Sequence, residues 1–159
     1  MWVPFDQLPS TARLWIFTSP SPLDTANIQP PLQEFVRTWT AHRQDLLASA
    51  WVYDDYFILL AVDEAQTSAS GCSIDKATRF VQDLGQSLNL NFLEKRRYFY
   101  RNGDQPIQVM DHQAMQAAVA DGIVAETTLV ADTLLTKVGD LDRLWLPFGQ
   151  SWHRRLFGR

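Results

Sequence analysis

The chain has 159 residues, of which 46% are hydrophobic and 20% are charged, and this composition excludes a disordered, fibrous or collagen-like protein. Eighteen acidic and fourteen basic residues give a net charge of −4, so we expect no nucleic-acid partner held by nonspecific contacts to phosphates. The single cysteine, Cys72, excludes an internal disulfide, and no spacing of cysteines and histidines indicates a metal site.

Targeting segments and nucleotide motifs are not recognisable in the sequence. Residues 1–10 lack the basic flank, apolar segment and cleavage site of a signal peptide, and no uncharged run approaches the roughly 18 residues of a membrane span. We therefore expect a soluble cytoplasmic protein of bacterial type with no membrane partner. Neither Gly-x-x-x-x-Gly-Lys-Ser/Thr nor Gly-x-Gly-x-x-Gly occurs, so we expect no nucleotide and no other cofactor.

The first half of the chain alternates short apolar runs with helical periodicity. Breaker and turn residues separate the runs, and the periodic segments repeat apolar residues at the spacing of one helix face. The predicted elements are a strand at Arg13–Thr18, a helix at Pro31–His42 entered through Pro30, strands at Leu47–Tyr53 and Tyr56–Val62 joined by a turn at Asp54–Asp55, and a helix that follows the N-cap Ser73 and ends near Leu88.

The second half of the chain begins with an aromatic strand and a tight turn. The Asn-Gly pair of Asn102–Asp104 suits a hairpin, and Gly122 suits the left-handed conformation at the end of a helix. The predicted elements are strands at Arg97–Arg101 and Ile107–Met110, a helix at Gln113–Ala120 capped by Asp111, a strand at Thr127–Ala131, and irregular, largely docked structure over 133–159.

The order strand, helix, strand, strand, helix, strand over the first hundred residues is that of a split βαβ unit. We therefore predict an α+β protein with a ferredoxin-like plait (βαββαβ) over residues 1–95, whose central strands are the first and the third. A small hairpin-helix-strand subdomain over residues 96–159 packs on the plait or shares the strand at Arg97–Arg101 with it. In this topology the loop after the third strand, the His42–Arg43 pair and Arg101 lie at one rim of the sheet.

The loop Asp63–Lys76 gathers small hydroxyl side chains, a glycine and the only thiol immediately before a helix. Backbone N–H groups at a helix start, together with the helix macrodipole, bind carboxylate, phosphate or sulfate groups. We therefore predict a non-enzymatic module that binds a small anionic ligand or a protein partner at this loop. The predicted ligand-binding residues are Arg43, Asp63, Ser70, Gly71, Cys72, Ser73 and Lys76.

An alternative function depends on the thiol of Cys72. A helix start favours the thiolate, which is the form of cysteine that attacks electrophiles or becomes oxidised. With His42 as the base at the same rim, the chain would be a cysteine-dependent enzyme or a redox sensor. Serine and glycine also occur at helix caps for structural reasons alone, and free cysteines are commonly buried, so a purely structural role for the loop stays open.

Two further segments combine basic and aromatic residues. Lys95–Arg101 interleaves them on a predicted strand, and a βαββαβ plait is the scaffold of RNA-recognition domains. RNA binding is the less favoured alternative, because the predicted third strand lacks that family's glycines and Lys95–Arg101 is more simply an edge strand with one solvated face. In the tail, Trp152 and Phe157 either anchor a partner or pack the C-terminus onto the core, and His153 has the chemistry to titrate near neutral pH.

Four segments together resemble a bacterial family of uncharacterised proteins, some of which carry the label ABC transporter ATPase; they are Trp39–His42, Ala61–Gln66, Ala69–Lys76 and Ser151–His153. The string Ser-Gly-Cys-Ser-Ile-Asp at Ser70–Asp75 is its most specific part, and the resemblance extends from about Leu14 to Phe157. It implies no activity, because the lysine motif for phosphate binding and the transporter signature are both missing here.

A second resemblance covers residues 98–147, where the hairpin, the short helix and the following strand are similar in spacing to the small bacterial GYF-like modules. This resemblance implies a surface that binds a partner or a peptide. The Gly-Pro pair that these modules usually carry after the hairpin turn is replaced here by Gln105-Pro106-Ile107, which departs from the pattern for recognition of proline-rich peptides.

Overall fold

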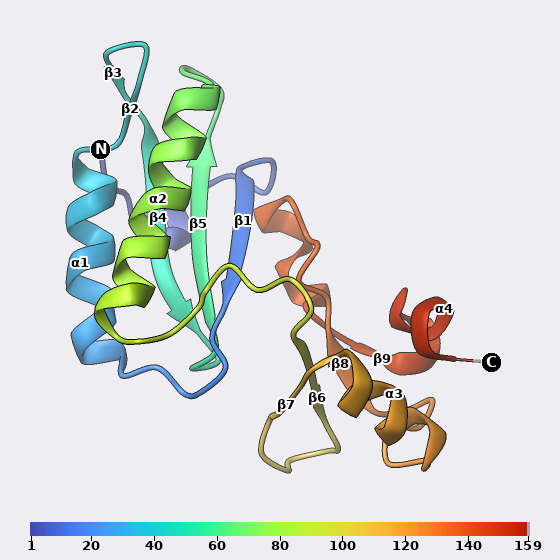
Figure 1. Ribbon diagram of the computed structural model, residues 1–159. Helices are drawn as coiled ribbons and strands as arrows, with labels where there is room; N and C mark the ends of the chain where they lie inside the picture. Colours follow the sequence, from blue (N-terminus) through green and yellow to red (C-terminus); the bar gives the residue numbers. More distant parts are fainter. Residues whose placement is uncertain (159) are drawn as a thin grey trace. The chain divides into compact units, whose positions relative to one another are not determined.

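The computed structural model describes residues 1–158, and the chain divides into two compact units. The first unit contains Met1–Leu93 and Leu135–Leu141, and the second contains Glu94–Leu134 and Asp142–Arg159. The sequence placed one boundary after residue 95, whereas the structure also returns residues 135–141 to the first unit. Both units combine helices with antiparallel strands, so the chain is a mixed α and β protein (Figure 1).

The first unit is built on a three-stranded antiparallel sheet in the order β1-β5-β4. Its strands are β1 (Arg13–Thr18), β4 (Leu47–Tyr53) and β5 (Phe57–Asp63), in agreement with the predicted strands to within one residue. β5 is central, and each of its residues before Asp63 is buried. The sequence predicted a two-residue turn between β4 and β5, but the pairing of Tyr53 with Phe57 leaves three residues, Asp54–Tyr56, in the turn. Asp54 and Asp55 have positive φ angles of 49° and 62°.

Two helices, α1 (Thr25–Arg37) and α2 (Gly71–Ser87), pack on one face of this sheet (Figure 1). Their apolar faces meet alternate residues of β4 and β5, because successive side chains of a strand point to opposite faces. The fully or nearly fully buried members of this core are Leu23, Ile28, Leu32, Val36, Trp39, Ala41, Leu46, Ala48, Ala50, Ile58, Leu60, Val62, Ala77, Val81 and Phe92. The stacked rings of Phe35 and Phe80, with centroids 4.4 Å apart, join the two helices directly.

The first helix differs at both ends from the prediction of Pro31–His42. It begins earlier because the Asp24 carboxylate accepts a hydrogen bond from the Ala26 N–H at 3.1 Å and caps the first turn. The Pro30–Pro31 pair therefore lies inside the helix, where each proline lacks a backbone N–H to donate. The helix ends earlier because the chain turns at Thr38 into a short strand, β2 (Thr40–Ala41).

The complete four-stranded plait is not confirmed. The order β1-β5-β4 matches three strands of the predicted arrangement, but the expected fourth strand, β6 (Tyr98–Arg101), pairs in another sheet. Beside β1, backbone bonds join the Leu14 N–H to the Thr136 carbonyl and the Val138 N–H to the Ala12 carbonyl. A segment from late in the chain thus covers part of the β1 edge that the fourth strand would occupy.

The outer edge of β4 is covered by the N-terminus and by one side chain of α1. The Ala48 N–H donates to the Met1 carbonyl at 3.0 Å. Farther along the strand, the Gln29 amide group donates to the Ala50 carbonyl at 2.8 Å and accepts from the Val52 N–H at 3.2 Å. Gln29 therefore imitates a neighbouring strand and satisfies backbone groups that an edge strand leaves open.

We expect Gln29→Leu to lower the free energy of unfolding by about 2 kcal/mol, because both partly buried backbone partners on β4 lose their hydrogen bonds. Urea denaturation followed by circular dichroism measures the change. The matched control is Gln33→Leu, one turn farther along α1 and partly exposed, which is expected to change the stability by less than about 0.5 kcal/mol. Equal losses in the two variants would contradict the role of Gln29.

The second unit contains a four-stranded antiparallel sheet in the order β7-β6-β8-β9 and the helix α3 (His112–Ala120). The other strands are β7 (Gln108–Met110), β8 (Leu129–Ala131) and β9 (Trp145–Pro147). The Asp111 carboxylate caps α3 by accepting from the Ala114 N–H at 2.7 Å, and Gly122 after the helix has a φ of 75°. The predicted cap and helix end are therefore confirmed.

The aromatic strand β6 is not the edge strand that the sequence predicted. It lies between β7 and β8, and Tyr98, Phe99 and Tyr100 are all buried. Alternation of charged and aromatic residues suggested one solvated face, but pairing on both sides and packing on both faces withdraw these rings from solvent. They are therefore not available for stacking on bases, which is the feature on which the RNA alternative depends.

The segment predicted to be irregular after residue 133 forms short elements, and its last residue lies outside the described part of the chain. Phe157 is buried and its ring meets Tyr98 edge-on, with centroids 4.8 Å apart, so the tail packs on its own unit. The short helical elements of the chain are η1 (Phe5–Gln7), η2 (Val138–Arg143), η3 (Phe148–Gln150) and α4 (His153–Phe157). Over residues 1–158, no helix is both long and apolar enough to cross a membrane.

Candidate functional site

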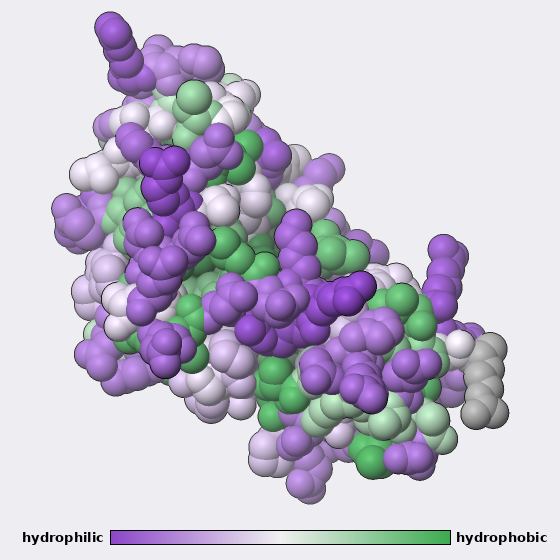
Figure 2. Space-filling view, in the orientation of Figure 1, coloured by the Kyte–Doolittle hydropathy of each residue, from purple (hydrophilic) through white to green (hydrophobic). Residues whose placement is uncertain are grey.

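A small hairpin of β2 (Thr40–Ala41) and β3 (Gln44–Asp45) projects beside the start of α2 (Figure 1). Its two-residue turn is His42–Arg43, with φ angles of 52° and 63°. Non-glycine residues rarely hold this left-handed conformation, and two in succession occur in tight hairpin turns of this kind. Both side chains are exposed, and the tip of the hairpin is hydrophilic in Figure 2.

The loop between β5 and α2 is held by its own acidic side chains. The Asp63 carboxylate accepts from the Ala65 N–H at 3.1 Å, and the Glu64 carboxylate accepts from the Ala69 N–H at 2.8 Å. Glu64 also lies 3.9 Å from the Arg13 guanidinium. Asp63 was predicted as a ligand-binding residue, but its position supports the loop, and its negative charge opposes the binding of an anion.

The first turn of α2 uses two of the predicted binding residues for capping. Ser70, and not Ser73 as predicted, is the N-cap: its hydroxyl oxygen accepts from the Ser73 N–H at 3.1 Å. The Ser73 hydroxyl donates back to the Ser70 carbonyl at 2.8 Å, and Ser73 is buried. Both hydroxyl groups therefore have partners within the protein, and the Ser73 amide is occupied as well.

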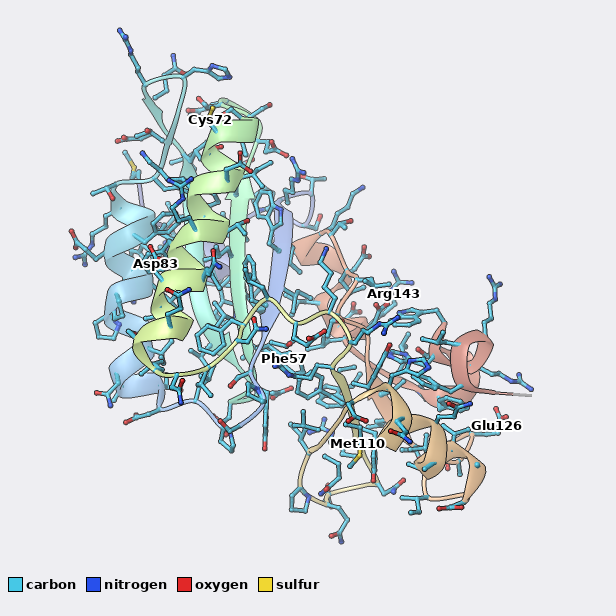
Figure 3. All side chains as sticks on the ribbon, viewed as in Figure 1. Phe57, Cys72, Asp83, Met110, Glu126 and Arg143 are labelled. Carbon is cyan, nitrogen blue, oxygen red and sulfur yellow. The ribbon has the colours of Figure 1, made fainter. Side chains whose placement is uncertain are left out.

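Two backbone N–H groups remain at this helix start. Gly71 and Cys72 are the first two residues of α2, are both exposed, and in the described residues their amides donate to no protein acceptor. A Cβ atom built on Gly71 would meet no atom within 4 Å, so the space beside this residue is open. Figure 3 shows Cys72 at this end of α2.

Two exposed basic residues belong to the elements that meet at this helix start. Lys76 is exposed and follows Cys72 by four residues, so the two share one face of the helix. Arg43 stands at the tip of the neighbouring hairpin, which is tied to the loop by a hydrogen bond from the Thr67 hydroxyl to the Gln44 side chain at 2.8 Å. Among residues 1–158, neither Lys76 nor Arg43 forms an ion pair.

Trp39 anchors the helix start to the core, a role that sequence reasoning missed. Its indole N–H donates to the Ser73 carbonyl at 2.9 Å, and its side chain is 1% exposed. The rings of Trp15 and Phe35 pack against it, with centroids at 5.9 and 5.3 Å. The available signal was a tryptophan at the end of an apolar helix face, which the sequence explained by packing alone.

The predicted rim is present in part. The hairpin turn His42–Arg43 and the start of α2 lie at one end of the first unit, but Arg101 belongs to β6 in the second unit. There its guanidinium lies over the Trp145 ring, 4.5 Å from the centroid. Arg101 was placed at the rim because β6 was expected to complete the first sheet, so this prediction is wrong for the same reason.

The alternative site requires an accessible Cys72 thiol and a contact between this thiol and His42, and the structure shows the first of these. The thiol is exposed, so a reagent can reach it. In the described part of the chain, however, no hydrogen bond joins the thiol to His42, which stands on the hairpin turn. Residues 1–158 also contain no group of three or more His, Cys, Asp or Glu side chains that could hold a metal ion.

Comparison of the chain with protein-family models, with curated proteins and with solved structures found no match. The two resemblances noted in the sequence therefore stay predictions. The candidate site is defined by its own geometry: the amides of Gly71 and Cys72, the open space beside Gly71, and the side chains of Lys76, Arg43 and His42.

Proposed function

We propose that this protein is a non-enzymatic module that binds a small anionic ligand at the start of α2. The observation that carries the proposal is the pair of exposed amides of Gly71 and Cys72, with open space beside Gly71, at the beginning of a 17-residue helix. A helix of this length presents about half a positive charge at its first turn. Such amides are the groups that bind phosphate, sulfate and carboxylate at helix starts.

The local charges favour an anion over a cation. The first turn of α2 contains no acidic residue, and Lys76 and Arg43 contribute positive charge that no carboxylate neutralises in the described residues. The nearest acidic side chains of the loop, Asp63 and Glu64, are engaged with loop amides. An incoming anion therefore replaces water at donors that are already oriented.

The charge of the whole unit favours a small ligand over a polyanion. Residues 1–93 and 135–141 contain six basic and eleven acidic residues, a formal charge of −5. A nucleic acid or an acidic protein surface would meet this net repulsion over a wide area, whereas a small anion meets only the local donors. We therefore favour a small anion over the protein partner that the sequence left open.

We expect inorganic phosphate to shift the amide resonances of Gly71 and Cys72 in a nuclear magnetic resonance titration of the full chain. Gly71→Pro removes one of the two donors and is expected to weaken phosphate binding by about tenfold. Proline suits the first position of a helix, whose N–H has no intrahelical partner. The Ser70 backbone, at φ −86° and ψ 165°, is extended, as the residue before a proline requires, so the variant keeps the fold.

Charge variants distinguish the effect of a charge close to the site from the effect of the protein's net charge. Lys76→Glu is expected to weaken phosphate binding by about tenfold, and the matched control Arg79→Glu, on an exposed residue of the same helix, by less than about twofold. Bound phosphate is also expected to slow alkylation of Cys72 by iodoacetamide. Unchanged affinity in Gly71→Pro, or equal losses in the two charge variants, would contradict the proposal.

A further inference from the structure

The turn between β6 and β7 contains the only Asn-Gly pair of the chain, Asn102–Gly103, and both residues are exposed. Among residues 1–158, the Gly103 N–H donates to no protein acceptor. A Cβ atom built on Gly103 would meet no atom within 4 Å, so the surroundings of this residue are open as well. The backbone nitrogen that follows the Asn102 side chain is therefore accessible and unoccupied.

The other asparagines of the chain have different surroundings. Each is followed by a large side chain, isoleucine, leucine or phenylalanine; they are Asn27, Asn89 and Asn91. A large side chain hinders the approach of an asparagine to the next backbone nitrogen, whereas glycine leaves that nitrogen open and its backbone adaptable. After Asn27 and Asn89 this nitrogen also donates a backbone hydrogen bond, at 3.0 and 2.8 Å. Asn102 alone combines a following glycine with a free N–H.

The Asn102 side chain connects its turn to the loop between α3 and β8. Its Nδ2 group donates to the Ile123 carbonyl at 3.1 Å, and its Oδ1 atom accepts from the Thr128 hydroxyl at 2.5 Å. The same hydroxyl accepts from the Ala125 N–H at 2.9 Å. We call these two side-chain bonds of Asn102 the clamp. The bond to Ile123 is exposed to solvent, so it opens more readily than a buried one.

We propose that Asn102 is a site of spontaneous deamidation and that the reaction releases the clamp. The Gly103 nitrogen loses its proton to solvent and forms a bond to the Cγ atom of Asn102. The bond from Cγ to Nδ2 breaks, Nδ2 leaves as ammonia, and a succinimide ring remains. Water then opens the ring at either carbonyl and gives aspartate or isoaspartate. One water is consumed and one ammonia is released, and the reaction needs no other reactant.

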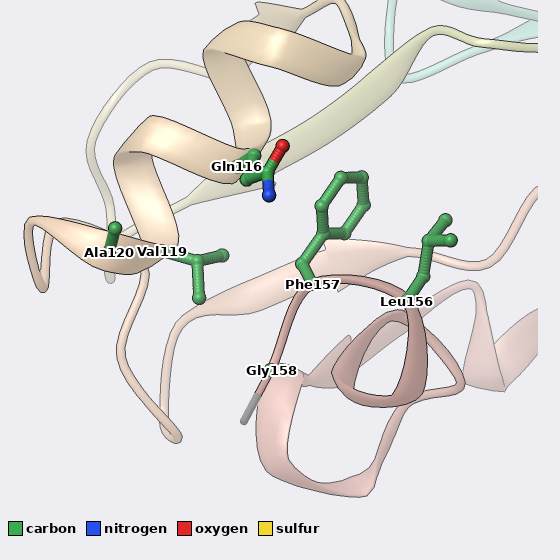
Figure 4. Close-up of a pocket in the computed structure, with 6 residues that line it drawn as sticks. All are labelled: Gln116, Val119, Ala120, Leu156, Phe157 and Gly158. Atoms are coloured by element: carbon green, nitrogen blue, oxygen red, sulfur yellow. The ribbon is translucent and has the colours of Figure 1, made fainter.

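Both products are incompatible with the clamp. In the aspartate product a carboxylate oxygen replaces the Nδ2 donor and faces the Ile123 carbonyl oxygen, and two acceptors cannot form a hydrogen bond. In the isoaspartate product the backbone runs through the former side-chain carbons, which lengthens the turn. The segment thus loosened directly follows α3, whose last two residues, Val119 and Ala120, line a pocket of 490 Å³ together with residues of α4 (Figure 4).

Incubation of the full chain at pH 8 and 37 °C, followed by peptide mass spectrometry, tests the site. Deamidation raises the mass by about 1 Da, and we expect this change at Asn102 at least about tenfold faster than at the other three asparagines. A rate at Asn102 equal to the rates at Asn27, Asn89 and Asn91 would overturn the proposal. The readout does not depend on the anion site, which lies in the first unit.

The variant Asn102→Asp tests release of the clamp, because it carries the aspartate product from the outset. Gln105→Glu is the matched control: it adds the same charge to the same exposed turn, and the Gln105 side chain is not part of the clamp. We expect Asn102→Asp to lower the midpoint of thermal unfolding by about 5 °C, and Gln105→Glu by less than about 1 °C. The amide resonances of Val119 and Ala120 are expected to move in Asn102→Asp only. Equal effects of the two variants would overturn release of the clamp.

Discussion

Replacing Trp39 with alanine is expected to lower the free energy of unfolding by about 4 kcal/mol, as loss of a fully buried tryptophan does. Trp39 is 1% exposed, and three kinds of contact end on it: the Phe35 and Trp15 rings, the surrounding aliphatic core, and the hydrogen bond to the Ser73 carbonyl. The substitution leaves a cavity and removes a buried hydrogen bond at once. Urea denaturation followed by circular dichroism at neutral pH measures the loss.

The variant Trp39→Phe separates these contributions. A phenyl ring keeps most of the packing but cannot donate a hydrogen bond to the Ser73 carbonyl. We therefore expect the free energy of unfolding to fall by about 1–2 kcal/mol and the first turn of α2 to be less firmly fixed. Because the first turn of α2 carries the amides of the proposed site, we expect Trp39→Phe to bind phosphate more weakly under conditions in which the variant is fully folded. A loss below about 1 kcal/mol in the alanine variant would show that Trp39 does not anchor the core.

Local chemistry accounts for the parts of the fold that the sequence predicted well. β1 and β4 follow from β-prone apolar runs bounded by turn residues, and α3 from the Asp111 cap and Gly122. Each of these signals acts within a few residues of its effect. The core of the first unit could be predicted for the same reason, because the spacing of apolar residues indicates which helix face is buried.

The partners of β6 could not be predicted from local chemistry. The strand was located to within one residue, but whether it joins β1 or pairs with β7 and β8 depends on contacts distant in sequence. The hairpin β6–β7 is a local alternative to a long-range pairing, and it leaves β1 to be covered in part by residues 136–138. The plait, the rim position of Arg101 and the edge role of β6 all depended on this single choice.

The candidate site was predicted at the level of the loop but not of the atom. Two serines, Ser70 and Ser73, were each able to cap α2, and only the geometry shows that the first does so and consumes the amide of the second. His42, the first residue of the hairpin turn, was predicted as the last residue of a helix, because an apolar helical spacing up to Trp39 outweighed the weak preference of histidine for positive φ angles. The donors that stay available, the amides of Gly71 and Cys72, lie between Ser70 and Ser73 in the sequence.

His153 is expected to make the stability of the protein depend on pH. Burial lowers the pKa of its imidazole to about 4, and the negative charge of Asp132 opposes this shift only in part. The side chain is 1% exposed, and its Nδ1 atom lies 2.5 Å from the Ser151 hydroxyl oxygen. The sequence allowed titration near neutral pH, and the structure corrects this because the ring is enclosed by its own unit, with Tyr98 edge-on at 6.0 Å.

The sign of the effect follows from which state binds the proton first. The unfolded chain protonates His153 near pH 6.5 and the folded chain near pH 4, so acidification stabilises the unfolded state between these values. We expect the free energy of unfolding to fall by about 2 kcal/mol between pH 7.5 and 5, and by about 3 kcal/mol in total once the pH is below 4. Above pH 7 the neutral imidazole carries no such penalty.

Urea denaturation at pH 7.5, 6 and 5 measures this dependence, and His153→Gln is the variant that should remove it. Glutamine keeps a polar group near Ser151 but binds no proton, so the unfolding free energy of this variant is expected to change with pH only through the titratable groups that both proteins share. The matched control is His112→Gln, on the partly exposed histidine of α3, which is expected to retain the full pH dependence. If the slopes of the original chain and of His153→Gln coincide between pH 7.5 and 5, His153 is protonated as readily in the folded protein as in the unfolded one, and the tail that carries it is open to water.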